Sequence, residues 1–430
     1  MALPQSLRYT GPLPAVTDLR SYTVESQSQS LTYSLGNASS DTIQLVIPAI
    51  QNGFIDPRTL YLHFTATNTS TDSSGNACAV RFSGSAQSII QRHDLYSGQS
   101  SASLLQTLDN YGVLAQALLD FEDPYLSSQA GSELMGTNYD NSIGVQRQGA
   151  QIAASGVKNY AIPIMSPLGV FSDKCIPLST GFTNFFYLAT GALALIQSSA
   201  GGTTAPANSL TLSNIRMVYR VIECPPQITQ ALYASGGGGP LQIPITSWVS
   251  STAVHPSGQS TNSILLGVSA ASAKSLLFGF RSCNVLSNCY ADSLAFRINP
   301  NIDSYWLQIG SSVLPVNKVR TDAQMLATTL QSRHLMGYKA STQFNSQNWN
   351  IPTYSSNTPV ASWLAGFDLD QITGRSDMVT SGLNLNGQIV TVNLNWVTGN
   401  VPGYPLQFNA HVERNALLNF QPGSGFTVAY

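Results

Sequence analysis

Charged side chains are scarce in this sequence. Lysine and arginine number 19 and aspartate and glutamate 21 among 430 residues, so only 9% of the chain is charged and the formal net charge is −2. Ordinary globular proteins carry about 25% charged residues. Proteins that bind nucleic acid by neutralising phosphates gather lysine and arginine on one face or in a tail. We therefore expect no direct sequence-specific binding of nucleic acid.

Long apolar segments and a secretion signal are also missing. The longest apolar run, Phe185–Ile196, has 12 residues, whereas roughly 20 are needed to span a bilayer. This run therefore predicts a buried strand and no transmembrane helix. Met1–Arg20 lacks the basic and apolar regions of a signal peptide, so secretion through such a signal is not expected.

The cysteines are few, odd in number and without a CxxC pair. This pattern argues against a disulfide framework, because such frameworks use an even number of cysteines in secreted proteins. It predicts reduced, mostly buried thiols in a protein made inside a cell. The five cysteines are Cys78, Cys175, Cys224, Cys283 and Cys289.

The usual signatures of several enzyme classes are absent. The sequence contains neither GxSxG nor HExxH, and Gly236–Gly239 is not followed by Lys-Ser or Lys-Thr as in a phosphate-binding loop. The histidines lie too far apart in the sequence to suggest a metal site. We therefore predict no catalytic residue, no cofactor and no metal. The histidines considered are His63, expected on the outer face of a strand, and His93, His255, His334 and His411.

Two acidic segments and one aromatic set are the remaining candidate sites. The segment from Asp368 to Asp377 resembles a calcium loop, but an apolar residue stands where a ligand is needed, so a polar turn is favoured. The acidic cluster at residues 120–123 could serve a hydrolase with paired carboxylates, but a solvated loop is favoured. The aromatic set could stack on sugars, but strand spacing favours a core role. The residues are Asp368, Asp370, Ile372, Gly374 and Asp377; Asp120, Glu122 and Asp123; and Trp349, Tyr354, Trp363 and Trp396.

Turn formers and apolar residues are abundant, with 34 glycines, 22 prolines and 43% hydrophobic residues. Short apolar segments between turn residues predict an all-β sandwich or barrel. Turns are expected at Gly53 and at Asp56-Pro57. The expected strands cover 31–35, 42–47, 60–64, 159–165, 174–178, 182–196 and 212–222, and then 264–268, 274–280, 294–298, 304–309, 387–397 and 405–416.

The segment Pro225–Pro240 has the composition of a linker, with two successive prolines and four successive glycines. It divides the chain into residues 1–224, a linker over 225–240, and residues 241–430. We expect each of the two long parts to form one β-domain.

The two parts share an order of elements that favours a duplication. At an offset of 216 residues, Leu60, Leu62 and Phe64 align with Leu276, Phe278 and Phe280. At an offset of 212, Gly98 aligns with Gly310, and a helix expected over 102–120 aligns with one expected over 322–335 that Thr321 would cap. Single matches of this kind also arise by chance, so the recurring order carries the inference.

These features together resemble the double jelly-roll major capsid proteins of membrane-containing tailless phages, adenoviruses and many eukaryotic DNA viruses. The residues that carry the resemblance are the segments 53–64 and 88–98, the helix through Leu119, and the segments 160–163 and 176–178. The resemblance implies two consecutive eight-stranded jelly-roll β-barrels with short loop helices. It covers nearly the whole chain.

The resemblance also implies a function. Members form pseudo-hexagonal homotrimers that tile an icosahedral shell, so we expect a non-enzymatic subunit of the virion, made inside the host cell. Its partners would be copies of itself, penton proteins and minor capsid proteins, and a viral membrane beneath the shell is left open. A chain that packs against its own copies benefits from weakly charged faces.

Three other functions stay open. The first is a carbohydrate-binding or carbohydrate-cleaving β-sandwich protein, suggested by the aromatic set and the acidic cluster. The second is a single jelly-roll coat protein of an RNA virus, disfavoured because Met1–Ser30 contains only Arg8 and Arg20 as basic residues. The third is a minor capsid or spike component of the same virion.

Overall fold

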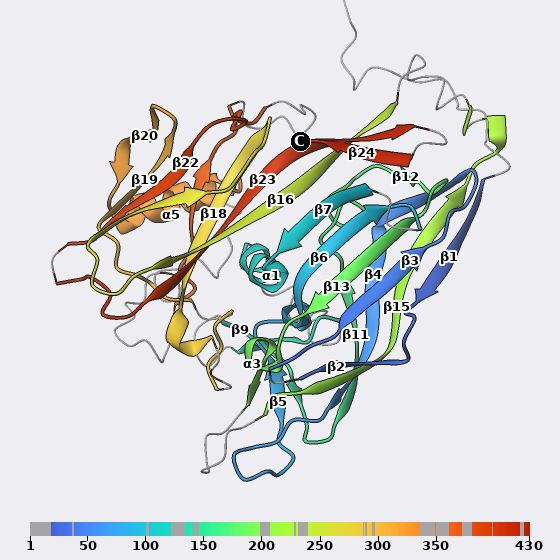
Figure 1. The fold of residues 1–430 in the computed structure, drawn as a ribbon, viewed down its shortest axis with the longest axis horizontal. Coiled ribbons are helices and arrows are strands. Elements are labelled where there is room, and N and C mark those ends of the chain that lie inside the picture. The colour runs from blue at the N-terminus through green and yellow to red at the C-terminus, as the bar shows by residue number, and fades with distance from the viewer. Residues whose placement is uncertain are drawn as a thin grey trace, which may run out of the picture.

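Two groups of antiparallel sheets, one before and one after residue 230, make up the described part of the chain (Figure 1). The computed structural model describes residues 19–430 with internal gaps. The gaps are 37, 100–102, 122–133, 141–145, 198–206, 228, 231–239, 287, 289, 295–296, 336–348, 350–360, 372–380, 398 and 422–424. Most of the predicted linker therefore lies outside the described residues.

The first group contains two main sheets around one core. One has the order β1-β15-β4-β11, with β2 and β12 at its margins, and the other has the order β3-β13-β6-β7. Their strands are β1 (Arg20–Gln27), β2 (Thr32–Leu35), β3 (Thr42–Ile47), β4 (Gly53–Asn68), β6 (Ile90–Ser97), β7 (Ser103–Asp109), β11 (Val157–Pro163), β12 (Ile176–Pro177), β13 (Phe182–Leu188) and β15 (Leu210–Glu223). Smaller sheets join β5 (Val80–Phe82), β10 (Gln151–Ile152) and β14 (Leu195–Gln197), and β8 (Thr137–Asp140) with β9 (Gln146–Gly149).

The second group repeats this plan. Its sheets have the orders β16-β23-β18-β21, with β24 added to β23, and β17-β22-β19-β20. Their strands are β16 (Leu241–His255), β17 (Thr261–Leu266), β18 (Ala273–Ser282), β19 (Ser304–Ile309), β20 (Ser312–Val319), β21 (Ala365–Asp368), β22 (Val390–Asn395), β23 (Leu406–Gln421) and β24 (Gly425–Ala429).

The strand orders of the two groups match one to one. β1, β15, β4 and β11 correspond to β16, β23, β18 and β21, and β3, β13, β6 and β7 correspond to β17, β22, β19 and β20. The eight corresponding strands of each group form two antiparallel four-stranded layers in which the first strand neighbours the last, as β1 neighbours β15 and β16 neighbours β23, which is jelly-roll topology. The expected all-β fold with two jelly rolls is confirmed, and the duplication is present in the strand order.

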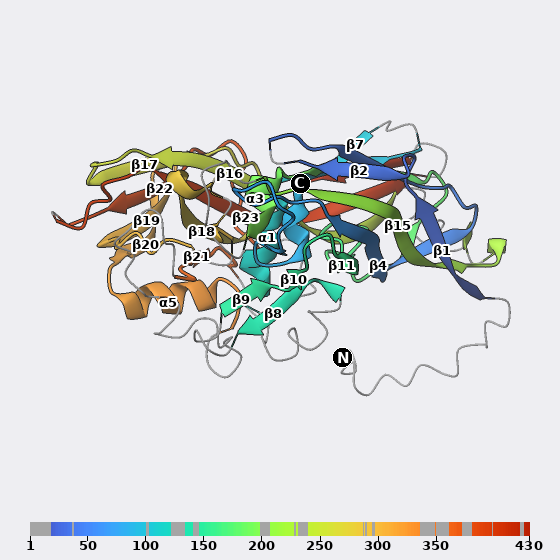
Figure 2. The ribbon, with the colours of Figure 1, turned by 90° about the horizontal axis from the view of Figure 1, so that it is seen from below.

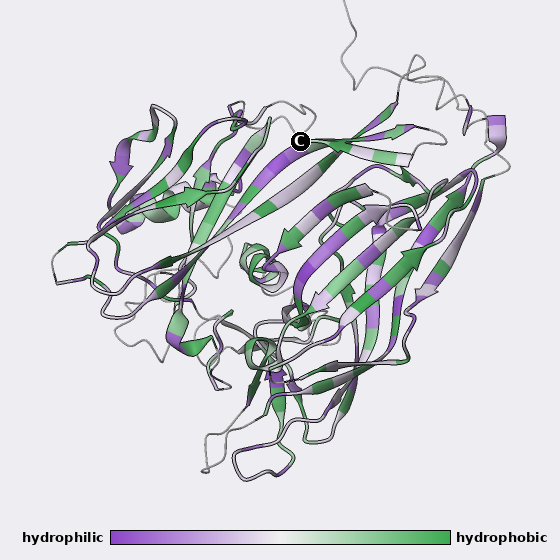
Figure 3. Cartoon of the chain, in the orientation of Figure 1, coloured by the Kyte–Doolittle hydropathy of each residue, from purple (hydrophilic) through white to green (hydrophobic). Residues whose placement is uncertain are grey.

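Alternation of apolar and polar residues positions the core of each group, as Figure 3 shows along the strands. Leu60, Leu62 and Phe64 in β4 are buried, while His63 between them is partly exposed on the outer face as predicted. The aligned residues Leu276, Phe278 and Phe280 in β18 are equally buried. Neighbouring side chains of a strand point to opposite faces, so this register places both triplets inside.

The second predicted helix is confirmed in its first ten residues as α5 (Asp322–Gln331). Thr321 accepts a hydrogen bond from the backbone N–H of Gln324, and the Gln324 side chain accepts one from the N–H of Thr321. This capping box satisfies two amides that the helix itself cannot.

The first predicted helix, 102–120, is wrong in its first half. β7 runs to Asp109 and the helix α1 (Tyr111–Leu119) begins after Asn110, whose φ of 52° ends the strand. The short intervals between apolar residues in this segment fit the period of a helix as well as that of a strand. The segment forms a strand because β7 pairs with β6. The glycines aligned in the sequence, Gly98 and Gly310, both have positive φ and turn the β6–β7 and β19–β20 hairpins.

Other local predictions are also corrected. The run 182–196 is not one strand, because β13 ends at Leu188 and the short helix α3 (Gly191–Ala194) precedes β14. Within 294–298, Arg297 and Ile298 form only isolated bridges. The predicted turn at Gly53 is confirmed, because the N–H of Gly53 donates to the carbonyl of Ile50 over 3.1 Å just as β4 begins. At Asp56-Pro57 the strand continues, and only its register with β15 shifts. Two further short helices are η2 (Ala86–Ile89) and η4 (Cys283–Val285).

The described cysteines are reduced, as predicted, but they are not buried. Cys175 is exposed and Cys78, Cys224 and Cys283 are partly exposed, because they lie in connections and at strand ends. Cys289 lies outside the described residues. No helix within the described ranges is both long and apolar enough to cross a membrane.

Candidate functional site

The two groups of sheets meet along a seam, defined here by β7 and α1 of the first group and by β16 and β24 of the second. Figures 1 and 2, at right angles to each other, both place the groups side by side with this seam between them. β16 and β24 both contact β7, and β24 also contacts β6. The jelly-roll topology of each group does not itself require this seam.

The C-terminal strand β24 anchors one end of the seam. It pairs with β23 of its own group but places Phe426 against Phe182 of the first group, with ring centroids 5.0 Å apart. The backbone N–H of Phe426 donates to Ser97 Oγ over 3.1 Å. The Tyr430 hydroxyl donates to the carbonyl of Leu105 in β7. Both the rings and the polar groups of this strand therefore bind across the seam.

A buried ion pair closes the other end. Arg297 of the second group pairs with Asp120 at the C-terminus of α1, and both side chains are almost fully buried. Arg297 also donates to the carbonyls of Trp363 and Ser362 over 3.0 and 2.8 Å. Gln116 Nε2 donates to the second carboxylate oxygen of Asp120 over 3.0 Å. Each charge thus has several partners, as a pair removed from water requires.

This position of Asp120 corrects the prediction of a solvated acidic loop. The carboxylate at the end of a helix faces unfavourable dipole charge, and Arg297 offsets it from a part of the chain 177 residues away. Glu122 and Asp123 lie outside the described residues.

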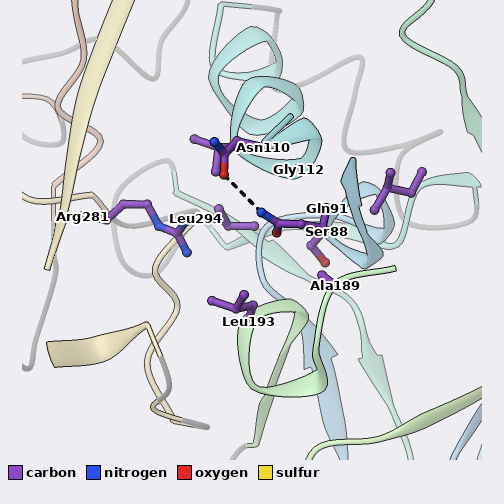
Figure 4. A pocket seen from close by; sticks show the side chains of 10 residues that line it. Ser88, Gln91, Asn110, Gly112, Ala189, Leu193, Arg281 and Leu294 are labelled. Atoms are coloured by element: carbon purple, nitrogen blue, oxygen red, sulfur yellow. Dashed lines mark hydrogen bonds between the residues drawn. The ribbon is translucent and has the colours of Figure 1, made fainter. Parts of the chain in front are cut away.

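A cleft of about 470 Å³ opens between the two groups beside α1. Its wall includes Gln91, Asn110 and Leu193 from the first group and Arg281 from the second. Figure 4 shows a smaller pocket of about 20 Å³ that shares these four residues and is also lined by Ser88, Gly112, Ala189 and Leu294. Arg281 donates to the carbonyl and the hydroxyl of Ser293 over 3.1 and 2.7 Å. Burial lowers the pKa of Arg281 to about 10, and nearby Asp292 opposes that shift. The lining of the cleft is mainly apolar, with Ala38, Ala192, Leu193 and Leu286 in its wall, and Arg281 is the charged residue among its described lining residues.

The aromatic candidates have core positions where the structure describes them. Trp349, Trp363 and Trp396 are buried. The indole N–H groups of Trp349 and Trp396 donate hydrogen bonds to backbone carbonyls. Trp363 packs on Phe278 and Phe280. These side chains offer no face to a sugar, so the core interpretation is confirmed for them. Tyr354 lies outside the described residues.

The acidic segment after β21 behaves as a turn at its start. The backbone N–H of Asp370 donates to Asp368 Oδ1 over 3.0 Å, as in a polar turn. Ile372, Gly374 and Asp377 lie outside the described residues. Within the described ranges, no three His, Cys, Asp or Glu side chains gather as metal ligands would.

The histidines are dispersed, and three of them are buried. His93 accepts or donates at Nε2 to Asn184 over 3.0 Å, and His411 bonds at Nδ1 to Ser250 over 2.9 Å. Burial lowers the pKa of His93 to about 4 and that of His411 to about 3. His255 stacks on Trp396, while His334 is exposed. The buried rings are therefore neutral parts of the core near pH 7.

Acid should destabilise the protein through these rings. Their pKa is lower in the folded chain than the ordinary 6.5, so the unfolded chain binds more protons as the pH falls below 6.5. The contribution of each neutral ring to the free energy of unfolding is complete above pH 6.5. It decreases between pH 6.5 and pH 4, by about 1.4 kcal/mol per pH unit for each ring. Urea titrations at several pH values between 4 and 7 give the free energy of unfolding at each pH. Between pH 6.5 and 4 this free energy should fall less steeply for His411→Gln than for the wild type. A slope equal to that of wild type, or an equal change in the exposed control His334→Gln, would contradict this.

The buried pair at the seam should behave as a unit. Asp120→Asn leaves the Arg297 charge buried without its partner, and we expect a loss of about 3–5 kcal/mol in the free energy of unfolding. The double variant Asp120→Leu, Arg297→Met should recover much of that loss, because it buries no charge. Asp173→Asn, which removes the exposed Arg58–Asp173 pair, is the control and should change little. Equal effects of Asp120→Asn and Asp173→Asn in urea titrations would refute the role of the buried pair.

The sequence matches no protein-family model and no curated protein. The structure is similar to the Faustovirus major capsid protein, with a TM-score of 0.61 and 10% identity over 97% of this chain and 93% of that one. It is similar to a chain of the PBCV-1 virus capsid, with a TM-score of 0.59 and 14% identity over 98% and 99%. It is also similar to the mavirus major capsid protein, with a TM-score of 0.52 and 11% identity over 100% of this chain and 95% of that one. At these identities the likeness shows the fold, and the chain has the double jelly-roll fold seen in these viral capsid proteins.

Proposed function

We propose that this chain is the major capsid protein of a DNA virus and that its role is structural. The observation that carries the proposal is the duplicated jelly roll with its internal seam, which matches viral capsid proteins over at least 97% of this chain. The two barrels would be residues 1–224 and 241–430, joined by the linker 225–240. In this role the protein belongs to the virion.

The assembly unit in this proposal is a homotrimer. Three copies of a chain with two similar barrels place six barrels around one axis, which gives a nearly hexagonal outline suited to tiling a closed shell. The scarcity of charge supports packing among copies, since no long-range repulsion opposes it. Penton proteins and minor capsid proteins are the further partners in this proposal, and the presence of a membrane beneath the shell is left open.

The alternative of a carbohydrate-binding protein loses its main support. The tryptophans that suggested it are buried in the core at positions 349, 363 and 396. The carboxylate that suggested sugar cleavage, Asp120, is engaged by Arg297.

The assembly state of the purified protein tests the proposal. Size-exclusion chromatography with light scattering should show a particle of three 45.9 kDa subunits, and electron microscopy should show hexagonal outlines or arrays. In purified virions the chain should be the most abundant protein by mass, which separates a major from a minor capsid role. A protein that stays monomeric at high concentration and forms no arrays would overturn the proposal.

A further inference from the structure

The edge strand β20 of the second group carries apolar residues that nothing in the described chain covers. It pairs with β19 on one side, and its other side is the end of the sheet β17-β22-β19-β20. Val316 is 87% exposed and Val313 38% exposed. Apolar side chains exposed on such an edge are open to packing against another chain, whereas Pro315 interrupts the row of N–H groups that strand pairing would need.

The equivalent edge of the first group, β7, is covered over much of its length, with Leu104 still 50% exposed. Gln106 of β7 lies opposite Leu95 in β6, as Leu314 of β20 lies opposite Leu307 in β19. Leu105 and Gln106 are only 1% and 2% exposed, because β16 and β24 lie against β7. The seam therefore buries the edge strand β7 of the first group, whereas no described part of the chain buries the equivalent strand β20 of the second group.

β16, which covers β7, also has an equivalent strand that is not covered. This equivalent is β1 of the first group, and the pairing registers within the two groups show which residue of β1 corresponds to which residue of β16. Met217 lies opposite both Leu62 and Ser26, and Ala410 lies opposite both Phe278 and Ser251. Since Leu62 matches Phe278, the residue Ser26 of β1 matches Ser251 of β16. These four pairings are read from the strand register alone.

Four residues earlier in each strand, the same register matches Tyr22 of β1 with Ser247 of β16. Ser247 is buried, whereas Tyr22 is 40% exposed and Leu19, just before β1, is 47% exposed. β1 and β20 lie at opposite ends of the molecule in both views (Figures 1 and 2). One end thus offers an uncovered copy of β7, and the other end an uncovered copy of β16.

We propose that β20 of one copy docks against β1 and the adjoining margin of the first group in the next copy, repeating the seam between chains. This inference rests on the proposed function and names the surfaces that build its trimer. The contact is heterologous, and a heterologous contact gives a ring when the rotation that it imposes closes. In the proposed trimer the ring closes after six barrels, which takes three chains. The apolar β20 edge and the exposed Tyr22 and Leu19 become buried in that ring.

A double substitution on β20 tests this docking. Val313→Glu with Val316→Glu places two charges in the contact, and we expect the trimer to become a monomer in light scattering with an unchanged circular dichroism spectrum. The matched control is Leu265→Glu on β17, the opposite edge strand of the same sheet, where Leu265 is 63% exposed. It should remain a trimer. Trimers that persist with the β20 substitutions, or loss of trimers in the control as well, would overturn the assignment to β20.

A cross-linking measurement does not depend on how well the charged variant folds. Tyr22→Cys combined with Val316→Cys places thiols at opposite ends of one chain, so a short bismaleimide that joins them must join different copies. Covalent dimers and trimers should appear on denaturing gels above the background of the native cysteines. Each single variant, and Leu265→Cys with Tyr22→Cys, should stay at that background. Trimeric wild-type protein without such cross-links would reject this interface and leave the proposed function standing, whereas monomeric wild-type protein would reject both.

Discussion

Coverage of the β7 edge is the constraint on which the arrangement of this molecule depends. A jelly roll leaves the margins of its sheets open, and an open margin with apolar residues is stable in water only when another surface lies on it. In the first group that surface comes from β16 and β24. The seam thus holds the two barrels in one orientation, with Phe426 at one end and the Arg297–Asp120 pair at the other.

The way the seam is built shows how a chain with little charge joins two barrels. Its contacts include ring packing between Phe426 and Phe182 and hydrogen bonds between neutral groups, as from Asn110 Nδ2 to Thr252 Oγ1 and from the Tyr430 hydroxyl to the carbonyl of Leu105. The one buried ion pair is enclosed by Ser362, Trp363 and Gln116, which supply the partners that water would otherwise provide. Charges without such support would be costly to bury, so neutral polar residues are the better choice on surfaces that pack together.

Alternation within a strand could be read from the sequence, whereas contacts between distant strands could not. Leu60, Leu62 and Phe64 revealed their strand and its repeat because the period of two is local. Thr321 and Gln324 revealed the start of α5 for the same reason. The strand at 103–109 was missed because its apolar spacing also fits a helix. Asp120 was misjudged because its partner lies 177 residues away in the sequence.

The path of β24 has a consequence for the order of synthesis. β24 follows every other strand of the chain, yet it completes the cover over β6 and β7, which are made early. Domains generally fold as units, the N-terminal one first, while the chain emerges from the ribosome. The edge of the first barrel at β6 and β7 therefore stays partly exposed until the second barrel has been synthesised. The complete seam forms only after both barrels have folded.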